Sequence, residues 1–127
     1  MQKTRKALEK QLDEAWSKAV KIKARYSCEY CRGKQNLNSH HIYSRVKKTT
    51  RWDLDNGICL CVAHHIGAGL SAHKTPTSFT LWLIEKKGKQ FVDLLTLKSN
   101  QIGKYSPFEL EIKLKELKQF IKENENV

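Results

Sequence analysis

The sequence has no long apolar run, and it has no internal repeat or low-complexity segment. A bilayer-spanning helix needs roughly 18 consecutive apolar residues, and no segment approaches that length. The basic start, residues 1–6, leads into a charged amphipathic segment rather than the apolar stretch of a secretory signal. We therefore expect a soluble protein that is neither exported nor built from repeats.

Acidic residues are also scarce, which leaves the chain strongly basic. Against 13 Asp and Glu there are 24 Lys and Arg, and the formal net charge is +11. Cationic side chains bind polyanions because they release the counterions condensed on phosphates, so nucleic acid is the first candidate partner. An anionic membrane surface would attract the same charge, but without a spanning segment we expect no membrane partner.

Length and cysteine content bound the organisation further. With 127 residues, we expect a single domain over 1–127 that buries roughly two-thirds of its unfolded surface. Four Cys in a basic chain without an export signal favour metal ligands over disulfides, which a reducing cytosol would not maintain.

Helical spacing of apolar residues predicts α-helices in both terminal parts of the chain. Residues 1–26 fit a basic amphipathic helix, because their apolar side chains recur on one helical stripe. Residues 76–127 predict C-terminal helices: one from Pro76, with Thr75 as N-cap, to Gly88, one over 91–97, and one from the capping box at 106–109 to Ile121.

The middle part, residues 27–75, predicts a small core with two antiparallel strands. The expected order is a tight knuckle over 27–33, a first strand within 37–46, a loop over 47–55, a second strand within 52–61 with the turn signal Asp55-Asn56-Gly57, and a helix beyond His64. The predicted fold class is therefore α+β, mainly helical.

Two chelating pairs predict a structural zinc site. Cys28 and Cys31 stand at Cys-x-x-Cys spacing, and Cys61 and His64 repeat that spacing. Such a site would contribute on the order of 10 kcal/mol to folding. A site of Cys28, Cys31, Cys59 and Cys61 is an alternative, because Cys59 shares a strand face with Cys61. In a further alternative His64 is only an exposed neighbour of the true ligand, and the zinc is held by three Cys and an unidentified group. Ordinary buried thiols are the remaining alternative.

Residues 28–83 resemble the HNH endonuclease family, particularly its small phage and bacterial members with a zinc-stapled ββα-metal core. Three motifs carry the resemblance: Ser39-His40-His41-Ile42, Arg51-Trp52-Asp53-Leu54-Asp55-Asn56-Gly57, and Leu60-Cys61-Val62-Ala63-His64-His65. The resemblance implies a hairpin and a helix around a catalytic divalent cation, beside the structural zinc and between flanking N- and C-terminal helices.

The resemblance also implies roles for single residues. His41 matches the general base, and Asn56 matches the central Asn whose amide holds the loop and so orients that base. His40 and His65 match ligands of the catalytic ion. His73 is a further candidate ligand, although it lies farther beyond His65 than in the His-rich members of the family.

The chemistry of phosphodiester hydrolysis agrees with these roles. An imidazole, with an ordinary pKa near 6.5, can deprotonate water, and a divalent cation can stabilise the charge that develops on the phosphate. Adjacent strand residues point to opposite faces, so His40 and His41 cannot both bind one ion through a regular strand. Imidazole ligands favour Mn²⁺, Ni²⁺ or Zn²⁺, whereas Mg²⁺ prefers oxygen, and we expect more than one of these ions to serve.

The loop between the predicted strands carries basic residues that could hold a phosphate backbone. They are Arg45, Lys47, Lys48 and Arg51. The basic residues from Lys3 to Arg25 could extend this contact, although a charged solvent face explains half of them without a partner. Trp52 in the same loop is expected to anchor the core rather than stack on a base.

These observations lead to the hypothesis of a metal-dependent HNH DNA endonuclease that leaves 5′-phosphate and 3′-hydroxyl ends and binds DNA mainly through phosphates. By family likeness, the protein is expected in the cytoplasm of a bacterial host, encoded by a phage or prophage, with packaging or recombination proteins as partners. Two alternatives are a structure-selective nuclease for branched DNA, which needs a homodimer rather than a monomer to cut both strands, and a non-catalytic zinc-knuckle DNA-binding module. RNA is a minor alternative substrate.

Overall fold

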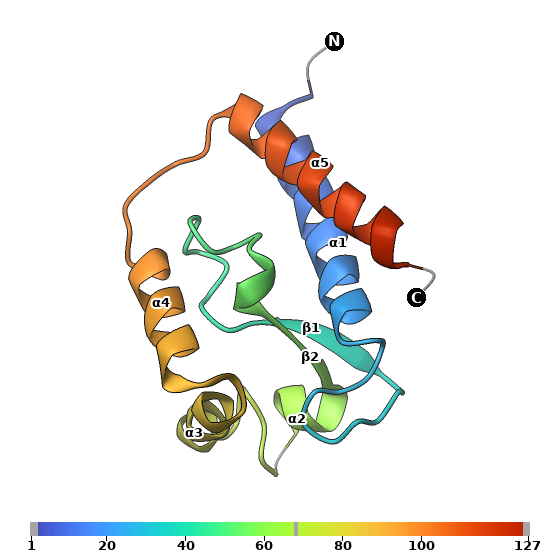
Figure 1. The fold of residues 1–127 in the computed structure, drawn as a ribbon, viewed down its shortest axis with the longest axis vertical. Coiled ribbons are helices and arrows are strands. Elements are labelled where there is room, and N and C mark those ends of the chain that lie inside the picture. Colours follow the sequence, from blue (N-terminus) through green and yellow to red (C-terminus); the bar gives the residue numbers. More distant parts are fainter. Residues whose placement is uncertain (1–2, 68, 126–127) are drawn as a thin grey trace.

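The computed structural model describes residues 3–67 and 69–125. The elements are α1 (Arg5–Lys23), β1 (Leu37–His41), a short 3₁₀-helix η1 (Leu54–Asn56), β2 (Gly57–Cys61), α2 (Val62–Ile66), α3 (Pro76–Lys87), α4 (Lys89–Ser99) and α5 (Pro107–Asn124). The two strands cross the middle of the molecule, with α1 and α5 on one side and α3 and α4 on the other (Figure 1). The α+β, mainly helical class with a two-stranded antiparallel hairpin is therefore confirmed.

Helices α1 and α5 pack against each other through the apolar faces that their sequences predict. The side chain of Thr4 caps α1 by accepting a hydrogen bond from the backbone N–H of Ala7 at 3.1 Å. Ser106 and Glu109 form the predicted capping box at the start of α5. The buried residues of this contact include Leu8, Leu12, Leu110, Leu114 and Leu117.

The hairpin begins and ends close to the predicted positions, with one difference in each strand. The register runs from Leu37 opposite Cys61 to His41 opposite Gly57. Strand β1 ends at His41 rather than continuing toward residue 46, because the opposite chain becomes the 3₁₀-helix η1: the N–H of Ile42 still donates to the carbonyl of Asn56, but the N–H of Asn56 donates to Asp53. Gly57 is the first residue of β2 rather than part of a turn, and its φ of −114° is ordinary extended backbone.

The short helix α2 begins directly after β2, earlier than predicted. Cys61 is its N-cap residue, so His64 and His65 lie within the helix and not ahead of it. Helix α3 begins at Pro76, as predicted, and ends before Gly88, whose φ of 94° suits glycine. Helix α4 is longer than expected and covers Lys89–Ser99.

The hairpin separates two apolar clusters of buried residues. Cys59 and Trp52 belong to the cluster formed with α1 and α5, which confirms Trp52 as a core anchor. Ile58 and Leu60 face the other way and pack in a cluster with Phe79 and Leu83 of α3 and with Cys28. Successive residues of β2 thus face opposite sides of the hairpin. The same alternation in β1 directs His40 and His41 to opposite sides. No helix within the described ranges is long and apolar enough to cross a membrane.

Candidate metal centres and active site

Cys28, Cys31, Cys61 and His64 form a compact group whose ligand atoms all lie within 4.8 Å of one another. The Sγ atoms of Cys31 and Cys61 are 3.8 Å apart, and Nδ1 of His64 lies 3.2 Å from Sγ of Cys61 and 3.8 Å from Sγ of Cys28. A tetrahedral zinc with bonds of about 2.0 to 2.3 Å places its sulfur ligands about 3.8 Å apart and its sulfur and nitrogen ligands about 3.6 Å apart. The group therefore fits a metal such as zinc.

The knuckle that carries the first two thiols is shaped by its own backbone. The N–H of Cys31 donates to Sγ of Cys28 at 3.5 Å, and the N–H of Gly33 donates to Sγ of Cys31 at 3.4 Å. Burial raises the pKa of Cys28, but backbone N–H donors outweigh it and hold the pKa below its ordinary value. The knuckle thus stabilises the thiolate of Cys28, which is the form that binds zinc. The N–H of Gly33 lowers the pKa of Cys31, but burial and the neighbouring thiols of Cys28 and Cys61 outweigh it and raise that pKa.

Cys59 lies outside this group, and the alternative ligand set that includes it is not the one the structure assembles. Its side chain is fully buried in the α1–α5 cluster, and burial raises its pKa to about 11. Cys61 leaves the shared strand face because it ends β2 and turns the chain into α2. His64 replaces Cys59 as the fourth member.

His40, His65 and His73 form a second group, which we call the histidine cluster, with ligand atoms within 4.8 Å of one another. Nε2 of His65 and Nε2 of His73 are 3.1 Å apart. The centroid of the His40 ring lies 5.0 Å from the ring centroid of His65 and 5.1 Å from that of His73. When two imidazoles bind one ion at about 2.1 Å, their coordinating nitrogens lie about 3.0 to 3.4 Å apart. The observed spacing fits that geometry.

Backbone hydrogen bonds explain how His73 reaches this cluster from a distant position in the sequence. The N–H of Ala72 donates to the carbonyl of His64, and the N–H of His73 donates to the carbonyl of His65, at 2.9 and 3.0 Å. The segment before α3 therefore runs beside α2, and the longer spacing between His65 and His73 does not keep their rings apart.

Two members of the histidine cluster, His40 and His65, have lowered pKa values, which favour the neutral form that binds metal. Burial, followed by the charges of His65 and His73, lowers the pKa of His40 to about 3. Burial and His73 also lower the pKa of His65. Nδ1–H of His65 donates to the amide oxygen of Asn38 at 3.0 Å, which leaves the lone pair on Nε2, facing His73. No carboxylate of the described residues belongs to the group.

His41 lies next to His40 in β1 but faces the opposite side of the hairpin. Its ring stacks on Trp16 of α1, with centroids 3.8 Å apart and an interplanar angle of 9°. Its Nε2 lies 2.9 Å from the carbonyl oxygen of Arg51, and because a carbonyl only accepts, Nε2 carries the hydrogen and Nδ1 keeps its lone pair. Burial lowers the pKa of His41, which favours the neutral ring.

Asn56 holds the chain just beyond His41. Its side chain is fully buried, its Oδ1 accepts from the N–H of Tyr43 at 2.7 Å, and its Nδ2 donates to the carbonyl of Tyr43 at 2.9 Å. Such a residue can position the loop but is screened from any substrate. Its place in the structure is thus that of a positioning residue rather than one that touches the reacting atoms.

The basic loop residues divide into exposed and internal ones. Arg45 and Lys47 are exposed, and Lys48 is partly buried and paired with a carboxylate of α1. Arg51 does not fit the predicted role as a DNA contact, because its side chain is only 8% exposed and its guanidinium is paired with Glu9 and Asp13. Its charge is already neutralised inside the protein.

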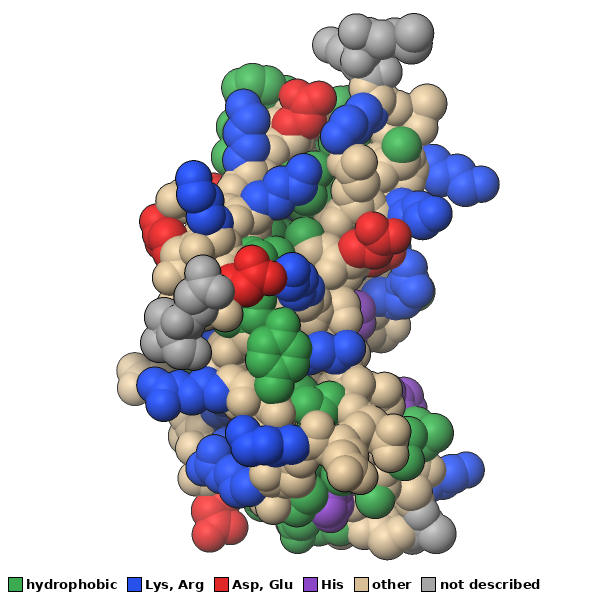
Figure 2. Space-filling model, turned by 90° about the vertical axis from the view of Figure 1, so that its right-hand side faces the viewer, with side chains coloured by type: hydrophobic (Ala, Val, Ile, Leu, Met, Phe, Trp, Pro, Cys, Tyr) green, Lys and Arg blue, Asp and Glu red, His purple; other side chains and the backbone are tan. Residues whose placement is uncertain are grey.

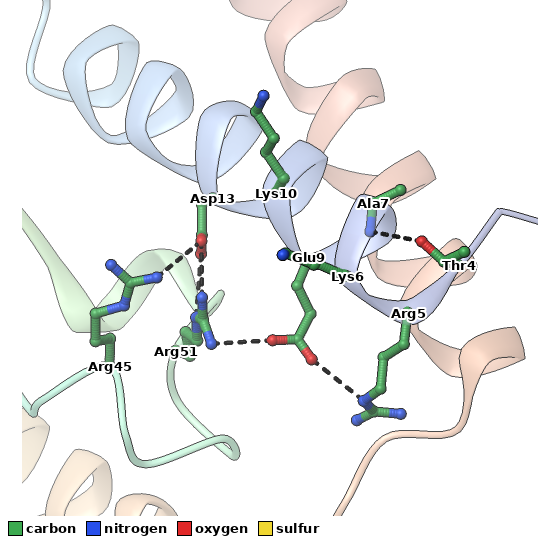
Figure 3. Close-up of a pocket in the computed structure, with 9 residues that line it drawn as sticks. All are labelled: Thr4, Arg5, Lys6, Ala7, Glu9, Lys10, Asp13, Arg45 and Arg51. Carbon is green, nitrogen blue, oxygen red and sulfur yellow. Dashed lines mark hydrogen bonds and ion pairs between the residues drawn. The ribbon is translucent and has the colours of Figure 1, made fainter.

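A groove of about 840 Å³ lies between the first half of α1 and this loop (Figure 3). Lys6 and Lys10 on its wall are exposed and stand outside the ion pairs that Figure 3 draws. On the side of the molecule that carries α1 and α5, Lys and Arg side chains are spread among few acidic ones (Figure 2). The groove is lined by Thr4, Arg5, Lys6, Ala7, Glu9, Lys10, Asp13, Arg45 and Arg51.

Sequence reasoning missed the residues of α1 that reach the candidate site. Glu9, Asp13 and Trp16 follow one another at intervals of four and three residues and so share one helical face. This spacing was the available signal, but nothing local shows that the face covers His41.

No family model, curated protein or solved structure matches the chain. The HNH likeness therefore remains a resemblance carried by the residues described above.

Proposed function

We propose that the protein is a metal-dependent HNH endonuclease that hydrolyses phosphodiester bonds in DNA. The observation that carries the proposal is the pairing of two imidazole environments on neighbouring strand positions. His40 belongs to a cluster with metal-ligand spacing, and His41 has Nε2 occupied by a carbonyl and Nδ1 left as an acceptor. Hydrolysis of a phosphodiester needs both a cation and a base.

The chemistry assigned to the protein side chains is a simple proton transfer. Nδ1 of His41 accepts a proton from a water molecule while the water oxygen bonds to phosphorus and the bond from phosphorus to the 3′ oxygen breaks. The leaving oxygen takes a proton from solvent, and His41 later returns its own, which gives 5′-phosphate and 3′-hydroxyl ends. A divalent ion held by His40, His65 and His73 would supply positive charge opposite the phosphate.

The ligand types favour a transition metal at the catalytic position. Three imidazoles without a carboxylate suit Mn²⁺, Ni²⁺ or Zn²⁺ better than Mg²⁺. We assign the Cys28, Cys31, Cys61 and His64 group to structural zinc. Because His64 and His65 are adjacent in α2, zinc bound to the first residue would fix the helix that presents the second.

The proposed DNA contact lies along the basic groove and loop. Lys6, Lys10, Arg45 and Lys47 are exposed, and although Arg45 is paired with Asp13, its side chain is still open to solvent, so we expect these four residues to bind phosphates. The affinity should then fall steeply with salt and depend little on sequence.

Nicking of supercoiled plasmid tests the proposal. The wild-type protein and His41→Ala are purified in parallel and incubated with plasmid and Mn²⁺, Ni²⁺, Zn²⁺ or Mg²⁺. We expect the wild type to nick with at least one transition ion, and the variant to be slower by about 10² to 10⁴, the usual contribution of a general base. Zinc content and DNA binding should be unchanged.

Two results would count against the proposal. Equal nicking by wild type and His41→Ala would remove His41 as the base. A wild-type protein that binds plasmid but leaves it supercoiled with every ion would instead support a non-catalytic zinc-knuckle module.

A further inference from the structure

We propose that Asp13 and Trp16 of α1 are positioning residues for His41. The inference rests on the proposed function, in which His41 is the base, and goes beyond it because α1 lies outside the segment that resembles HNH endonucleases. In this proposal α1 supports the active site directly and does not only carry basic residues for DNA binding.

Trp16 fixes the plane of the His41 ring. The two rings are nearly parallel at 3.8 Å, so rotation of the imidazole about its bond to Cβ would drive it into the indole. The indole is itself immobile, because Trp16 is buried and its Nε1–H donates to the carbonyl of Asp53 at 2.8 Å.

Asp13 fixes the carbonyl to which His41 is bonded. Its carboxylate accepts Nε–H and Nη2–H of Arg51 at 3.1 and 2.7 Å, and it also accepts Nε1–H of Trp52 at 2.8 Å. One acidic side chain therefore holds two consecutive side chains of the loop. Figure 3 shows this carboxylate between the guanidinium groups of Arg51 and Arg45. Nη2–H of Arg45 also donates to it, at 3.1 Å.

These two restraints control different motions of one ring. The stack with Trp16 sets the ring plane, and the bond from Nε2 to the Arg51 carbonyl sets which nitrogen carries the hydrogen and where Nδ1 points. Catalytic groups must be held within roughly 0.5 Å and 10–20° of the productive geometry, and a misplacement of about 1 Å can cost about 100-fold in rate. Loss of either restraint should therefore slow catalysis while His41 itself remains present.

The kinetic test separates positioning from stability and from DNA binding. We expect Asp13→Asn and Trp16→Leu to lower kcat by about 10-fold to 100-fold. Asp13→Asn should not raise the KM for DNA, because it removes a negative charge from the wall of the basic groove. Trp16→Phe, which keeps a stacking ring, should stay within a few-fold of the wild type.

Leu114→Ala is the matched control for a merely structural effect. Leu114 is buried in the same contact between α1 and α5, so the variant loses stability without removing a contact to His41. Assayed under conditions where urea titration shows it to be folded, Leu114→Ala should keep the wild-type kcat. Equal losses of kcat in Leu114→Ala and Asp13→Asn would overturn the proposal.

Nuclear magnetic resonance of the His41 ring gives a readout that does not need activity. Stacking on Trp16 should shift the His41 ring protons upfield, and Trp16→Leu should return them toward ordinary positions. Nitrogen-15 shifts should report a single Nε2–H tautomer in the wild type and an averaged one in Asp13→Asn. Unchanged spectra together with unchanged kcat in both variants would overturn the positioning role. A wild type that cleaves no DNA yet shows these shifts would overturn the proposed function alone.

Discussion

Replacing Gly57 by Ala tests how closely α1 lies on the hairpin beneath His41. Gly57 pairs with His41 in the register, and its backbone angles are ones that any residue adopts. A Cβ at this position would overlap Cγ2 of Val20 and lie 2.9 Å from Cζ2 of Trp16. Both neighbours are buried in the α1 core, so neither side chain can move aside into solvent.

The expected cost follows from two opposing effects. Overpacking a filled core typically costs about 1–3 kcal/mol, because side chains leave their rotamers or elements move apart. Alanine offsets part of that, since glycine within a strand is less stable than alanine by about 0.5–1 kcal/mol. We expect Gly57→Ala to lower the free energy of unfolding by about 1 to 2 kcal/mol.

Urea unfolding of a double-mutant cycle would measure this contact directly. Val20→Ala removes the methyl group that the new Cβ would overlap, so the double variant should be more stable than the sum of the single losses predicts, by about 1 kcal/mol. Gly69→Ala is the control, because a methyl there meets no described atom within 4 Å, and it should change stability by less than about 0.5 kcal/mol. A fully stable Gly57→Ala, or strictly additive losses, would refute the reasoning.

Three further predictions concern the two candidate metal centres and the loop between the strands. Folding lowers the pKa of His40 from 6.5 to about 3. Between these two values the unfolded chain binds a proton that the folded ring does not, so the free energy of unfolding is highest above pH 6.5 and falls as the pH drops toward 3. Without added divalent ions, the wild type should lose about 2 kcal/mol more than His40→Gln between pH 8 and pH 5 in urea titrations, and equal losses would contradict this. Cys61→Ser should lose bound zinc in elemental analysis whereas Cys59→Ala keeps it, and zinc retained in Cys61→Ser would exclude the assigned ligand set. Asn56→Ala leaves the buried N–H and carbonyl partners on Tyr43 unpaired and should cost about 2 to 4 kcal/mol in the same titrations; a loss below about 1 kcal/mol would contradict it.

The parts of the fold that depend on neighbouring residues were predictable from the sequence. The capping box at Ser106 and the proline at position 76 mark helix starts because they act within a single turn. The pairs Cys28–Cys31 and Cys61–His64 likewise present two ligands through local backbone geometry alone. The separation of His40 from His41 follows from the alternation of a strand.

The parts that sequence reasoning missed depend on contacts between distant segments. Arg51 has the same appearance in the sequence as an exposed Arg, and only its pairing with Asp13, at a separation of 38 residues, shows that it is internal. Gly57 follows Asn56 in a common turn pair. Its role instead comes from the close approach of α1. His73 is a candidate ligand by resemblance, but the backbone pairing beside α2 that brings it to the cluster is not visible in the ligand spacing.

The packing of α1 on α5 has a consequence for protein synthesis. Arg5 donates to the carbonyl of Tyr105, a contact that spans 100 residues. The apolar face of α1 is completed by Leu110, Leu114 and Leu117. Until α5 has been synthesised, the part of that face that α5 buries stays exposed to solvent, and exposed apolar surface of this kind binds chaperones. Because the same helix carries Trp16 beneath His41, the stacked position of the His41 ring should become fixed late in synthesis, after α5 has emerged and docked.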